Sequence, residues 1–357
     1  MRPILANYYV TYRCNATCSF CDIWEQPSPM VDVKDVERNL RDMRELGVRV
    51  VDFTGGEPLL HTDLPEMLAI AKGHGLATSV TTNGLLYPKR AKKLAGLVDL
   101  LHFSIDSAEP EMHNASRGVD CFDKLMESID TALSLGERPD LLFTVTNENV
   151  DQMEKIYETI SFPNRLVLIL NPLFEYASLG DSLSRDVMDR MDAMNRRPLT
   201  YLNPSFLDLR RKGGNDPENP VCKAVSTCIV ISPFNELVLP CYHYGLEKIP
   251  IGDSLKDVWN SDRVSFHRQW EGRHDVCKGC SINCYFEPSF AVSPMSKYFW
   301  KSIPSKVGYG WTKYITQKYL DKVPREAVLP LRPEVGTNGD QSGMYELPVI
   351  QHNPISR

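Results

Sequence analysis

Ten cysteines among 357 residues are the part of this sequence best suited to chemistry. Cys14, Cys18 and Cys21 form a C-x3-C-x2-C pattern, six more lie between residues 222 and 284, and Cys121 stands alone. Three thiolates so close in sequence can converge on one metal centre, whereas a structural zinc site takes four protein ligands. The triad therefore predicts a [4Fe–4S] cluster with one iron left open. A zinc knuckle with a distant fourth ligand is the alternative.

The second group consists of Cys222, Cys228, Cys241, Cys277, Cys280 and Cys284. Residues 229–239 have the pattern of a β-hairpin that turns at residues 233–236, so thiols far apart in the sequence can meet at its base. Six thiolates suffice for one complete iron–sulfur cluster, and a structural zinc ribbon is the alternative.

The elements that must position these residues follow a repeating pattern from residue 4 to about 172. The predicted strands are Leu5–Tyr12, Arg49–Thr54, Ala77–Thr82, Leu100–Ile105, Leu141–Thr146 and Leu166–Leu170. Amphipathic helices lie between them; one begins at Asp32 and ends at Gly47, and another follows Asn149. Strands alternating with helices predict a parallel sheet, with ligand-binding residues at the carboxyl ends of its strands. All six ends are polar or turn-forming, which predicts one large site.

Two motifs together resemble the signatures of the radical S-adenosylmethionine (radical SAM) superfamily. They are the cysteine triad, with Phe20 before its third cysteine, and Gly55-Gly56-Glu57-Pro58 after the second strand. The resemblance covers about residues 4–172 and implies an α/β fold, a partial (β/α)6 TIM-like barrel. It also implies that the triad holds a [4Fe–4S] cluster and that the amino and carboxylate groups of SAM chelate the open iron.

The same resemblance implies which residues contact SAM: Phe20, Gly55, Gly56, Glu57, Asn83, Ser104, Asp106 and Asn171. The glycine-turn backbone and the Glu57 carboxylate would contact the methionine ammonium. Asn83, Ser104 and Asp106 would contact the methionine carboxylate and the ribose, and Asn171 would lie near the adenine. Arg117 stands where many relatives carry an arginine near SAM, and a solvated loop arginine is the alternative.

The C-terminal cysteines resemble the SPASM and twitch modules that follow many radical SAM barrels and bind auxiliary [4Fe–4S] clusters. A full SPASM module uses seven cysteines, so the six present here favour one complete cluster. Two ligand sets stay open. The twitch-like set is Cys222, Cys241, Cys277 and Cys280. The other is Cys222, Cys228, Cys241 and Cys284, which leaves Cys277 and Cys280 for an incomplete second cluster with His243 or a substrate atom. Cys121 is interpreted as a packing residue, with hydrogen-atom donation as the alternative.

These features divide the chain into a barrel core (1–198), a connector (199–220), an auxiliary-cluster module (221–290), a basic aromatic tail (291–335) and a flexible C-terminus (336–357). Residues 295–320 contain five lysines, seven aromatic residues and no Asp or Glu. Lysine interleaved with Trp and Tyr is typical of a membrane interface. A basic helix packed on the barrel is the main alternative, and contact with a peptide or nucleic acid is a third.

Composition and charge exclude several classes of protein. The chain is 42% hydrophobic and 24% charged, which is typical of a globular protein and excludes a disordered one. A net charge of −6 makes nucleic acid an unexpected partner. No apolar run is long enough for a signal peptide or a membrane span. Reduced cysteines then fit a cytoplasmic protein, with membrane association at the inner face expected if the tail binds lipid.

The reaction implied by the resemblance is reductive cleavage of SAM to a 5′-deoxyadenosyl radical, which abstracts hydrogen from a substrate. A flavodoxin or ferredoxin would supply the electron. Peptide or protein modification, or dehydrogenation, is the favoured expectation. A small alcohol or a lipid-linked substrate is the main alternative, and a non-catalytic iron–sulfur electron carrier is an alternative from another class.

Overall fold

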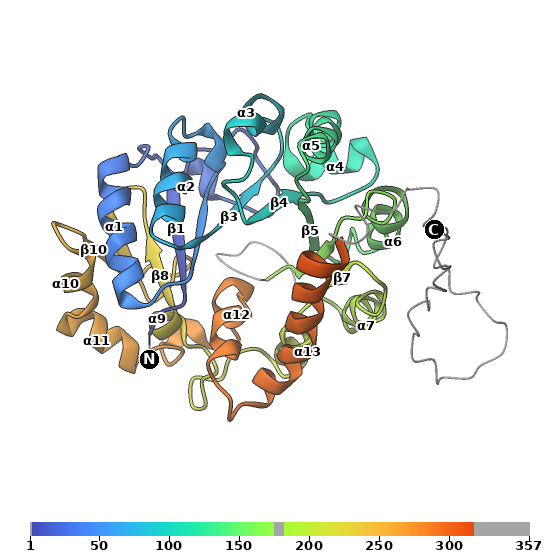
Figure 1. The fold of residues 1–357 in the computed structure, drawn as a ribbon. Helices are drawn as coiled ribbons and strands as arrows, with labels where there is room; N and C mark the ends of the chain where they lie inside the picture. Colours follow the sequence, from blue (N-terminus) through green and yellow to red (C-terminus); the bar gives the residue numbers. More distant parts are fainter. Residues whose placement is uncertain (1, 175–181, 318–357) are drawn as a thin grey trace, which may run out of the picture.

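The computed structural model describes residues 2–174 and 182–317, and its centre is a ten-stranded sheet (Figure 1). The strands β1 to β7 are parallel and curve into a partial barrel. Their bounds are β1 Leu5–Thr11, β2 Val50–Gly55, β3 Ala77–Thr82, β4 Leu100–Ser104, β5 Asp140–Val145, β6 Leu168–Pro172 and β7 Thr200–Tyr201. All six predicted strands are confirmed, with ends that differ by up to two residues.

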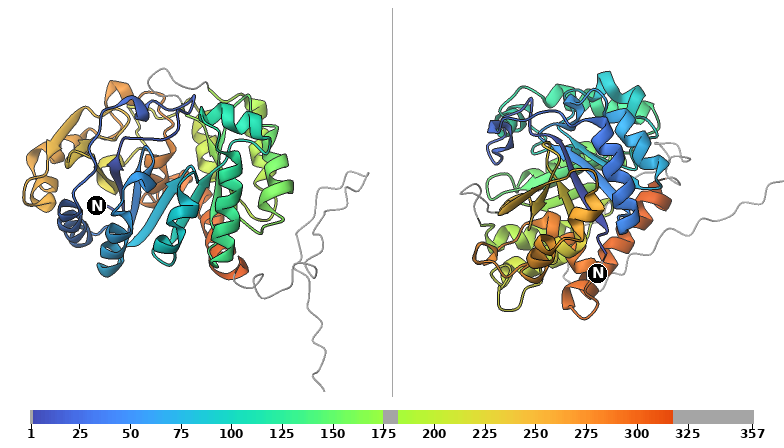
Figure 2. Two further views of the ribbon diagram at one scale, coloured as in Figure 1. Left: turned by 90° about the horizontal axis from the view of Figure 1, so that it is seen from above. Right: turned by 90° about the vertical axis from the view of Figure 1, so that its left-hand side faces the viewer.

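Helices cover the outer face of this barrel (Figure 2). They are α1 Val33–Leu46, α2 Leu64–Gly73, α3 Tyr87–Leu94, α4 Pro110–Arg117, α5 Phe122–Ser134, α6 Gln152–Ile156 with a π-helical turn at Tyr157–Ser161, and α7 Arg185–Met194. The side chain of Asp32 accepts a bond from the Lys34 N–H at the start of α1, and Gly47 ends α1 at φ +115°. The predicted helix from Asp32 to Gly47 is therefore confirmed.

Alternation along the strands separates an apolar outer face from a polar inner face. Tyr8 and Phe53 pack outward in the main hydrophobic core with the helices. Their neighbours Asn7 and Asp52 point to the inner face, where Asp52 accepts a hydrogen bond from Ser79 of β3. The interior of the barrel therefore carries groups that can bind a ligand.

The second cysteine region extends the same sheet. Strands β8 Cys228–Ile231, β9 Glu236–Leu239 and β10 Glu247–Pro250 are joined antiparallel, and β8 pairs parallel with β1 from Leu5↔Cys228 to Tyr8↔Ile231. The hairpin predicted over residues 229–239 is confirmed. Its union with the barrel sheet was not predicted, because no local pattern records a pairing between segments so far apart in sequence. Figure 2 shows this yellow and orange segment beside the blue N-terminal strands.

Six further helices complete the described fold: α8 Pro204–Arg211, α9 Ala224–Thr227, α10 Leu255–Trp259, α11 Asp262–Gln269, α12 Asn283–Ala291 and α13 Lys297–Trp311. Helix α13 packs against α8 and α12 and continues in a π-helical turn, Thr312–Thr316. Near its end Tyr309 donates to Asp140 at 2.6 Å, and Lys313 Nζ lies 2.7 Å from the other oxygen of that carboxylate.

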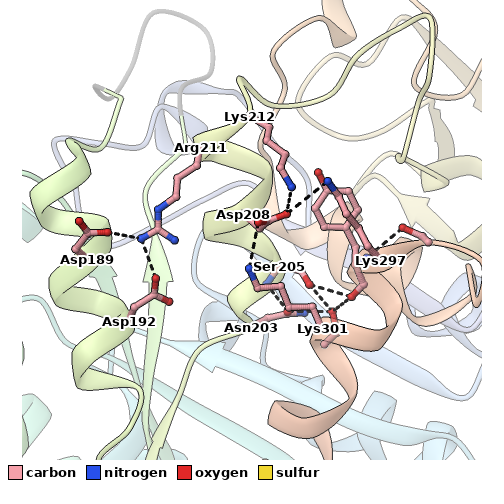
Figure 3. Close-up of polar contacts among 12 residues, drawn as sticks. Asp189, Asp192, Asn203, Ser205, Asp208, Arg211, Lys212, Lys297 and Lys301 are labelled. Atoms are coloured by element: carbon pink, nitrogen blue, oxygen red, sulfur yellow. Dashed lines mark hydrogen bonds and ion pairs between the residues drawn. The ribbon is translucent and has the colours of Figure 1, made fainter. Parts of the chain in front are cut away.

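The described part of the tail is thus a basic helix packed on the barrel, which was the main alternative to membrane contact. Its lysines pair with acids of the same chain: Lys297 and Lys301 with Asp208 (Figure 3) and Lys306 with Glu287. Some of its aromatic residues stay exposed, and membrane contact remains an untested prediction. No helix in residues 2–174 or 182–317 is long and apolar enough to cross a membrane. The rest of the tail and the predicted flexible C-terminus lie outside the described residues.

The buried pair between Lys313 and Asp140 gives a stability prediction. The Asp140 side chain is 0% exposed, so Lys313→Met leaves a buried carboxylate without its cation. We expect a loss of about 3–5 kcal/mol of unfolding free energy in urea titrations. The matched control is Lys301→Met, which breaks an exposed pair and should cost at most about 1 kcal/mol. Equal losses in the two variants would contradict this assignment.

Candidate functional site

The first cysteine group lies on the loop that follows β1, and α4 holds that loop in place. Thr17 N donates to Arg117 O at 3.0 Å, and Ser19 N donates to Ser116 O at 3.1 Å. At Gly118, φ is +66° and a Cβ would stand 2.2 Å from Thr17 Oγ1, so glycine allows this close approach. The loop therefore takes its course from a helix about a hundred residues downstream.

The three thiols of this loop are partly exposed and close enough to affect one another. Burial raises the pKa of Cys14 to about 12 and that of Cys21 to about 11. The negative charges of neighbouring thiolates add to both rises, and the Glu57 carboxylate adds to the rise at Cys14. Without a metal the Cys14 and Cys21 thiols would be neutral at pH 7. Coordination supplies the positive charge that deprotonates a thiol outright, so the environment suits a bound cluster better than free thiolates.

The glycine turn packs directly on the end of β1. Gly56 N donates to Thr11 O and Glu57 N donates to Arg13 O, both at 2.9 Å. A Cβ at Gly56 would stand 2.2 Å from Arg13 O, and one at Gly55 would stand 2.0 Å from Thr11 O. Only glycine fits at both positions, so the two signature motifs meet at one site through backbone contact.

The Glu57 carboxylate is 1% exposed and its oxygens have partners within the protein. One oxygen accepts from Leu59 N and Thr82 Oγ1, and the other accepts from Asn83 N at 2.9 Å. Burial raises its pKa, and these bonds oppose the rise. In this structure Glu57 joins the glycine turn to the end of β3, which is a positioning role. Contact with the methionine ammonium stays a prediction.

Asp106 and Arg117 form a buried connection from β4 to the cysteine loop. Arg117 Nε lies 2.6 Å from Asp106 Oδ2, and Arg117 Nη1 lies 3.8 Å from Cys18 Sγ. The guanidinium also stands 5.5 Å from the centre of the Phe20 ring. The Arg117 side chain is only 8% exposed, so its interpretation as a solvated loop residue is wrong.

A hollow of about 440 Å³ opens beside this pair, a volume typical of small-molecule sites. Its lining consists of Ser19, Phe20, Asp106, Met112, Ala115, Ser116, Thr146, Glu148, Asn149 and Leu173. Phe20 and Asp106 were predicted to bind SAM. The others were missed as site residues, because single polar residues in loops and helix ends carry no spacing signal. Thr146 had been noted only as part of a polar strand end, and Asn149 only as the residue that precedes a predicted helix.

The six other predicted SAM residues lie outside this lining; besides Gly55, Gly56 and Glu57, described above, they are Asn83, Ser104 and Asn171. Asn83 donates to Asn15 of the cysteine loop at 2.8 Å, and Ser104 is buried at the end of β4. Asn171 accepts from Asn283 of α12 at 2.6 Å, so its amide connects the barrel to the cysteine-rich region. The structure thus gives Asn83 and Asn171 joining roles, and their contact with SAM stays a prediction.

In the second group, four cysteines surround one cavity. Its lining contains Cys222, Cys241, Cys277 and Cys280 together with Asn215, Ala224, Pro240, Tyr244, Gly272, Ile282, Tyr285 and Phe286. These four are the twitch-like set. Burial raises the pKa of each of the four thiols, as at the first group.

Cys228 and Cys284 lie outside that lining. Cys228 is buried at the start of β8, whereas Cys284 is exposed in the first turn of α12. Burial raises the pKa of Cys228, and the Asp52 carboxylate on the inner face of the barrel adds to that rise. The charges of Cys284 and Cys241 also help to raise the pKa of Cys228, so these thiols lie near one another, and the alternative ligand set stays an untested prediction. Cys121 is 1% exposed at the start of α5, as expected for a packing residue.

Asn215, in the connector, organises the second group and was missed by the sequence analysis. Its Nδ2 donates to Gly272 O and Cys277 O, and its Oδ1 accepts from the N–H groups of Val221 and Cys222. One buried amide thus holds together three segments that carry or flank ligand candidates. A single asparagine in a Gly-, Asn- and Pro-rich loop gives no sequence signal of such a role.

Sets of three and four cysteines are donor sets that [4Fe–4S] clusters use. In the described part of the chain, no three Cys, His, Asp or Glu side chains converge closely enough to hold a single metal ion. In the second group the four thiols lie around a shared cavity, which is the arrangement that a cluster of several irons requires. The first group provides three thiols beside a hollow, which leaves room for a further ligand on the fourth iron.

Comparisons with known proteins agree with this geometry. Residues 8–160 match the model of the radical SAM superfamily. The chain is 32% identical over 213 residues to a probable GTP 3′,8-cyclase of Methanococcus maripaludis, covering 57% of this chain and 70% of that relative. It is 29% identical over 225 residues to a probable GTP 3′,8-cyclase of Sulfurisphaera tokodaii, covering 58% and 72%.

Two solved structures are similar in fold. Streptococcus suis SuiB bound to the precursor peptide SuiA has a TM-score of 0.61 and 17% identity, covering 80% of this chain and 71% of SuiB. The enzyme anSMEcpe with bound AdoMet (SAM) and Cp18Cys peptide has a TM-score of 0.58 and 18% identity, covering 90% and 100%. At these identities the likeness concerns the fold alone.

The contact of Gly56 with the cysteine loop gives a binding prediction. Gly56→Ala forces a Cβ against Arg13 O and Tyr12 O, at 2.2 and 2.4 Å, so the turn must move. We expect a loss of stability of about 1–3 kcal/mol and weaker SAM binding, measured by equilibrium dialysis on reconstituted protein. Gly73→Ala is the matched control, since its added Cβ meets nothing within 4 Å and should leave SAM binding unchanged. Wild-type SAM affinity in Gly56→Ala would refute the prediction.

Proposed function

Because the chain belongs to the radical SAM superfamily, we propose that it modifies a peptide or protein by hydrogen abstraction, assisted by an auxiliary [4Fe–4S] cluster. Cys14, Cys18 and Cys21 would hold the catalytic cluster, and Cys222, Cys241, Cys277 and Cys280 the auxiliary one. With its cofactors bound, the first site supplies a 5′-deoxyadenosyl radical. A flavodoxin or ferredoxin is the proposed electron donor.

The observation that carries the proposal is the contact between the two sites. Leu173 lines the hollow beside the first cysteine group. The Arg210 guanidinium donates both to Leu173 O and to Ser281 O, the residue after Cys280. A substrate held in the barrel near the hollow would therefore lie close to the auxiliary site. This closeness is what transfer of an electron from a substrate radical requires.

On three of the described barrel strands, no unpaired cation is available to bind the phosphates of a nucleoside triphosphate. The charged or titratable groups on β2, β4 and β5 are Asp52, His102 and Asp140, and Lys313 beside them is already paired with Asp140. Binding a triphosphate calls for several unpaired Arg or Lys donors or exposed backbone N–H groups. We therefore do not extend the cyclase activity of the similar proteins to this chain.

The peptide substrate is proposed from the auxiliary-cluster module, and two proteins of similar fold were solved with a peptide. SuiB and anSMEcpe, each solved with a peptide, resemble this chain over 80–90% of its length. The two cyclases described above match only 57–58% of it. A small alcohol or a lipid-linked molecule remains the alternative substrate, and no contact in the described residues favours either.

Cleavage of SAM tests the enzyme class. Protein reconstituted anaerobically with iron and sulfide should convert SAM to 5′-deoxyadenosine when a reductant is added, as measured by chromatography. Changing Cys14, Cys18 and Cys21 to Ala should abolish the product, because the first cluster loses its ligands. Cys121→Ala, which removes a buried thiol that belongs to neither proposed ligand set, should retain it. If the wild-type protein forms no product with several reductants, the electron-carrier alternative is favoured instead.

Isotope transfer tests the substrate class. Short peptides encoded beside the gene, prepared with deuterated side chains and Cα positions, are incubated with the reconstituted enzyme, SAM and reductant. We expect deuterium in 5′-deoxyadenosine and a mass change in one peptide. GTP deuterated at C3′ serves as the comparison and should transfer none. Transfer from GTP, with all peptides unchanged, would replace this proposal by the cyclase activity.

A further inference from the structure

Arg210, the penultimate residue of α8, lies between the barrel and the second cysteine group. Its Nη2 donates to Pro172 O at 3.1 Å, Leu173 O at 3.3 Å and Ser281 O at 3.0 Å. Its Nη1 donates to Phe206 O at 3.3 Å. Four carbonyl oxygens thus hold the guanidinium at the end of β6, next to the residue that follows Cys280.

The charge of Arg210 has no carboxylate partner in the described residues. Its neighbour Arg211 differs, since it pairs with Asp189 at 2.7 Å and Asp192 at 2.8 Å, as Figure 3 shows. Arg117, the arginine of the first site, pairs with Asp106. Carbonyl oxygens satisfy the donors of Arg210 but carry no net charge, so this partly buried cation lacks a neutralising negative charge.

The pKa of the Arg210 guanidinium reflects these surroundings. Burial lowers the pKa of Arg210 to about 9, and the negative charge of a Cys280 thiolate opposes that change. The side chain is still cationic at pH 7. Its nearest source of compensation is therefore the cysteine site, once the thiols there are ionised.

A bound auxiliary cluster would provide that compensation. A [4Fe–4S] centre with four thiolates is an anion, and reduction adds another negative charge. A fixed cation at short range stabilises the reduced state more than the oxidised one, and so raises the reduction potential. A cluster that accepts an electron from a substrate radical benefits from such a shift.

We propose that Arg210 is the fixed counter-charge of the auxiliary [4Fe–4S] cluster and raises its reduction potential. The inference rests on the auxiliary cluster of the proposed function and adds a residue that acts on that cluster without binding it. Arg210 is thus a positioning residue whose charge, rather than its bulk, carries the effect.

The test is a redox titration followed by electron paramagnetic resonance. The full chain carries Cys14, Cys18 and Cys21 changed to Ala, so that only the auxiliary cluster contributes. In this background Arg210→Gln removes the charge, Arg210→Lys keeps it, and Arg211→Gln removes a charge that is already paired. Iron and sulfide are counted for each protein before titration.

We expect Arg210→Gln to lower the ratio of reduced to oxidised cluster at a fixed potential about tenfold, equivalent to about 59 mV for one electron. Arg210→Lys should keep most of the wild-type potential, and Arg211→Gln should leave it unchanged. If Arg210→Gln fails to load iron while Arg210→Lys loads it, the need for the charge is equally established.

Two results would overturn the inference. An unchanged potential in a loaded Arg210→Gln protein, or loss of the cluster in both Arg210 variants, would show that the charge is not what matters. Failure of the starting background itself to bind about four irons would instead refute the auxiliary cluster, and with it the role of Arg210. The iron count therefore separates failure of the proposed function from failure of this inference.

Discussion

The parallel pairing of β1 on both of its edges is the interaction on which the rest of the structure depends. One edge bonds to β2, which ends in the glycine turn, and the other bonds to β8, which begins at Cys228. The strand itself runs into the loop of the first cysteine group. Because main-chain hydrogen bonds set the register of all three strands, one seven-residue segment determines how three functional segments lie relative to one another.

Buried amides and glycines then complete what the strands begin. Three asparagine side chains join segments that are distant in sequence. Asn83 and Asn215 each donate and accept hydrogen bonds through the side-chain amide. Asn283 donates two hydrogen bonds, to Asn171 and to Pro172 O. Gly56 and Gly118 allow backbone to approach the cysteine loop more closely than any side chain would permit. The two cysteine regions are thus held in place both by hydrogen bonds of buried amide side chains and by close backbone contacts.

The acid-free segment after residue 295 has an explanation in the structure. Its lysines meet Asp208, Glu287 and Asp140, which belong to α8, α12 and β5. A carboxylate within the helix would repel these acids, whereas lysine neutralises them. The local excess of positive charge in the sequence is therefore compensated across the fold as far as the structure describes it. Arg210, in contrast, is a partly buried cation without a carboxylate partner in the described residues.

The sequence by itself determined the barrel and the catalytic motif. Strand and helix patterns are local, so β3 was predicted at its observed bounds, and the end of α1 could be predicted from Gly47. The spacing of Cys14, Cys18 and Cys21 is likewise local, and so is the glycine turn at Gly55 and Gly56. In each case the physical cause lies within a few residues of its effect, so the pattern can be read along the chain.

Only the tertiary structure decided which cysteines share a cavity. It decided that Asn171, Arg117 and Arg210 each form polar contacts between elements that are distant in sequence. It also decided that the hairpin extends the barrel sheet and that α13 packs on the barrel through Lys313. These outcomes depend on pairs of residues far apart in the sequence. Their energies come from enclosure and from charges brought together only after the chain has folded, and no residue's neighbours in sequence record that information.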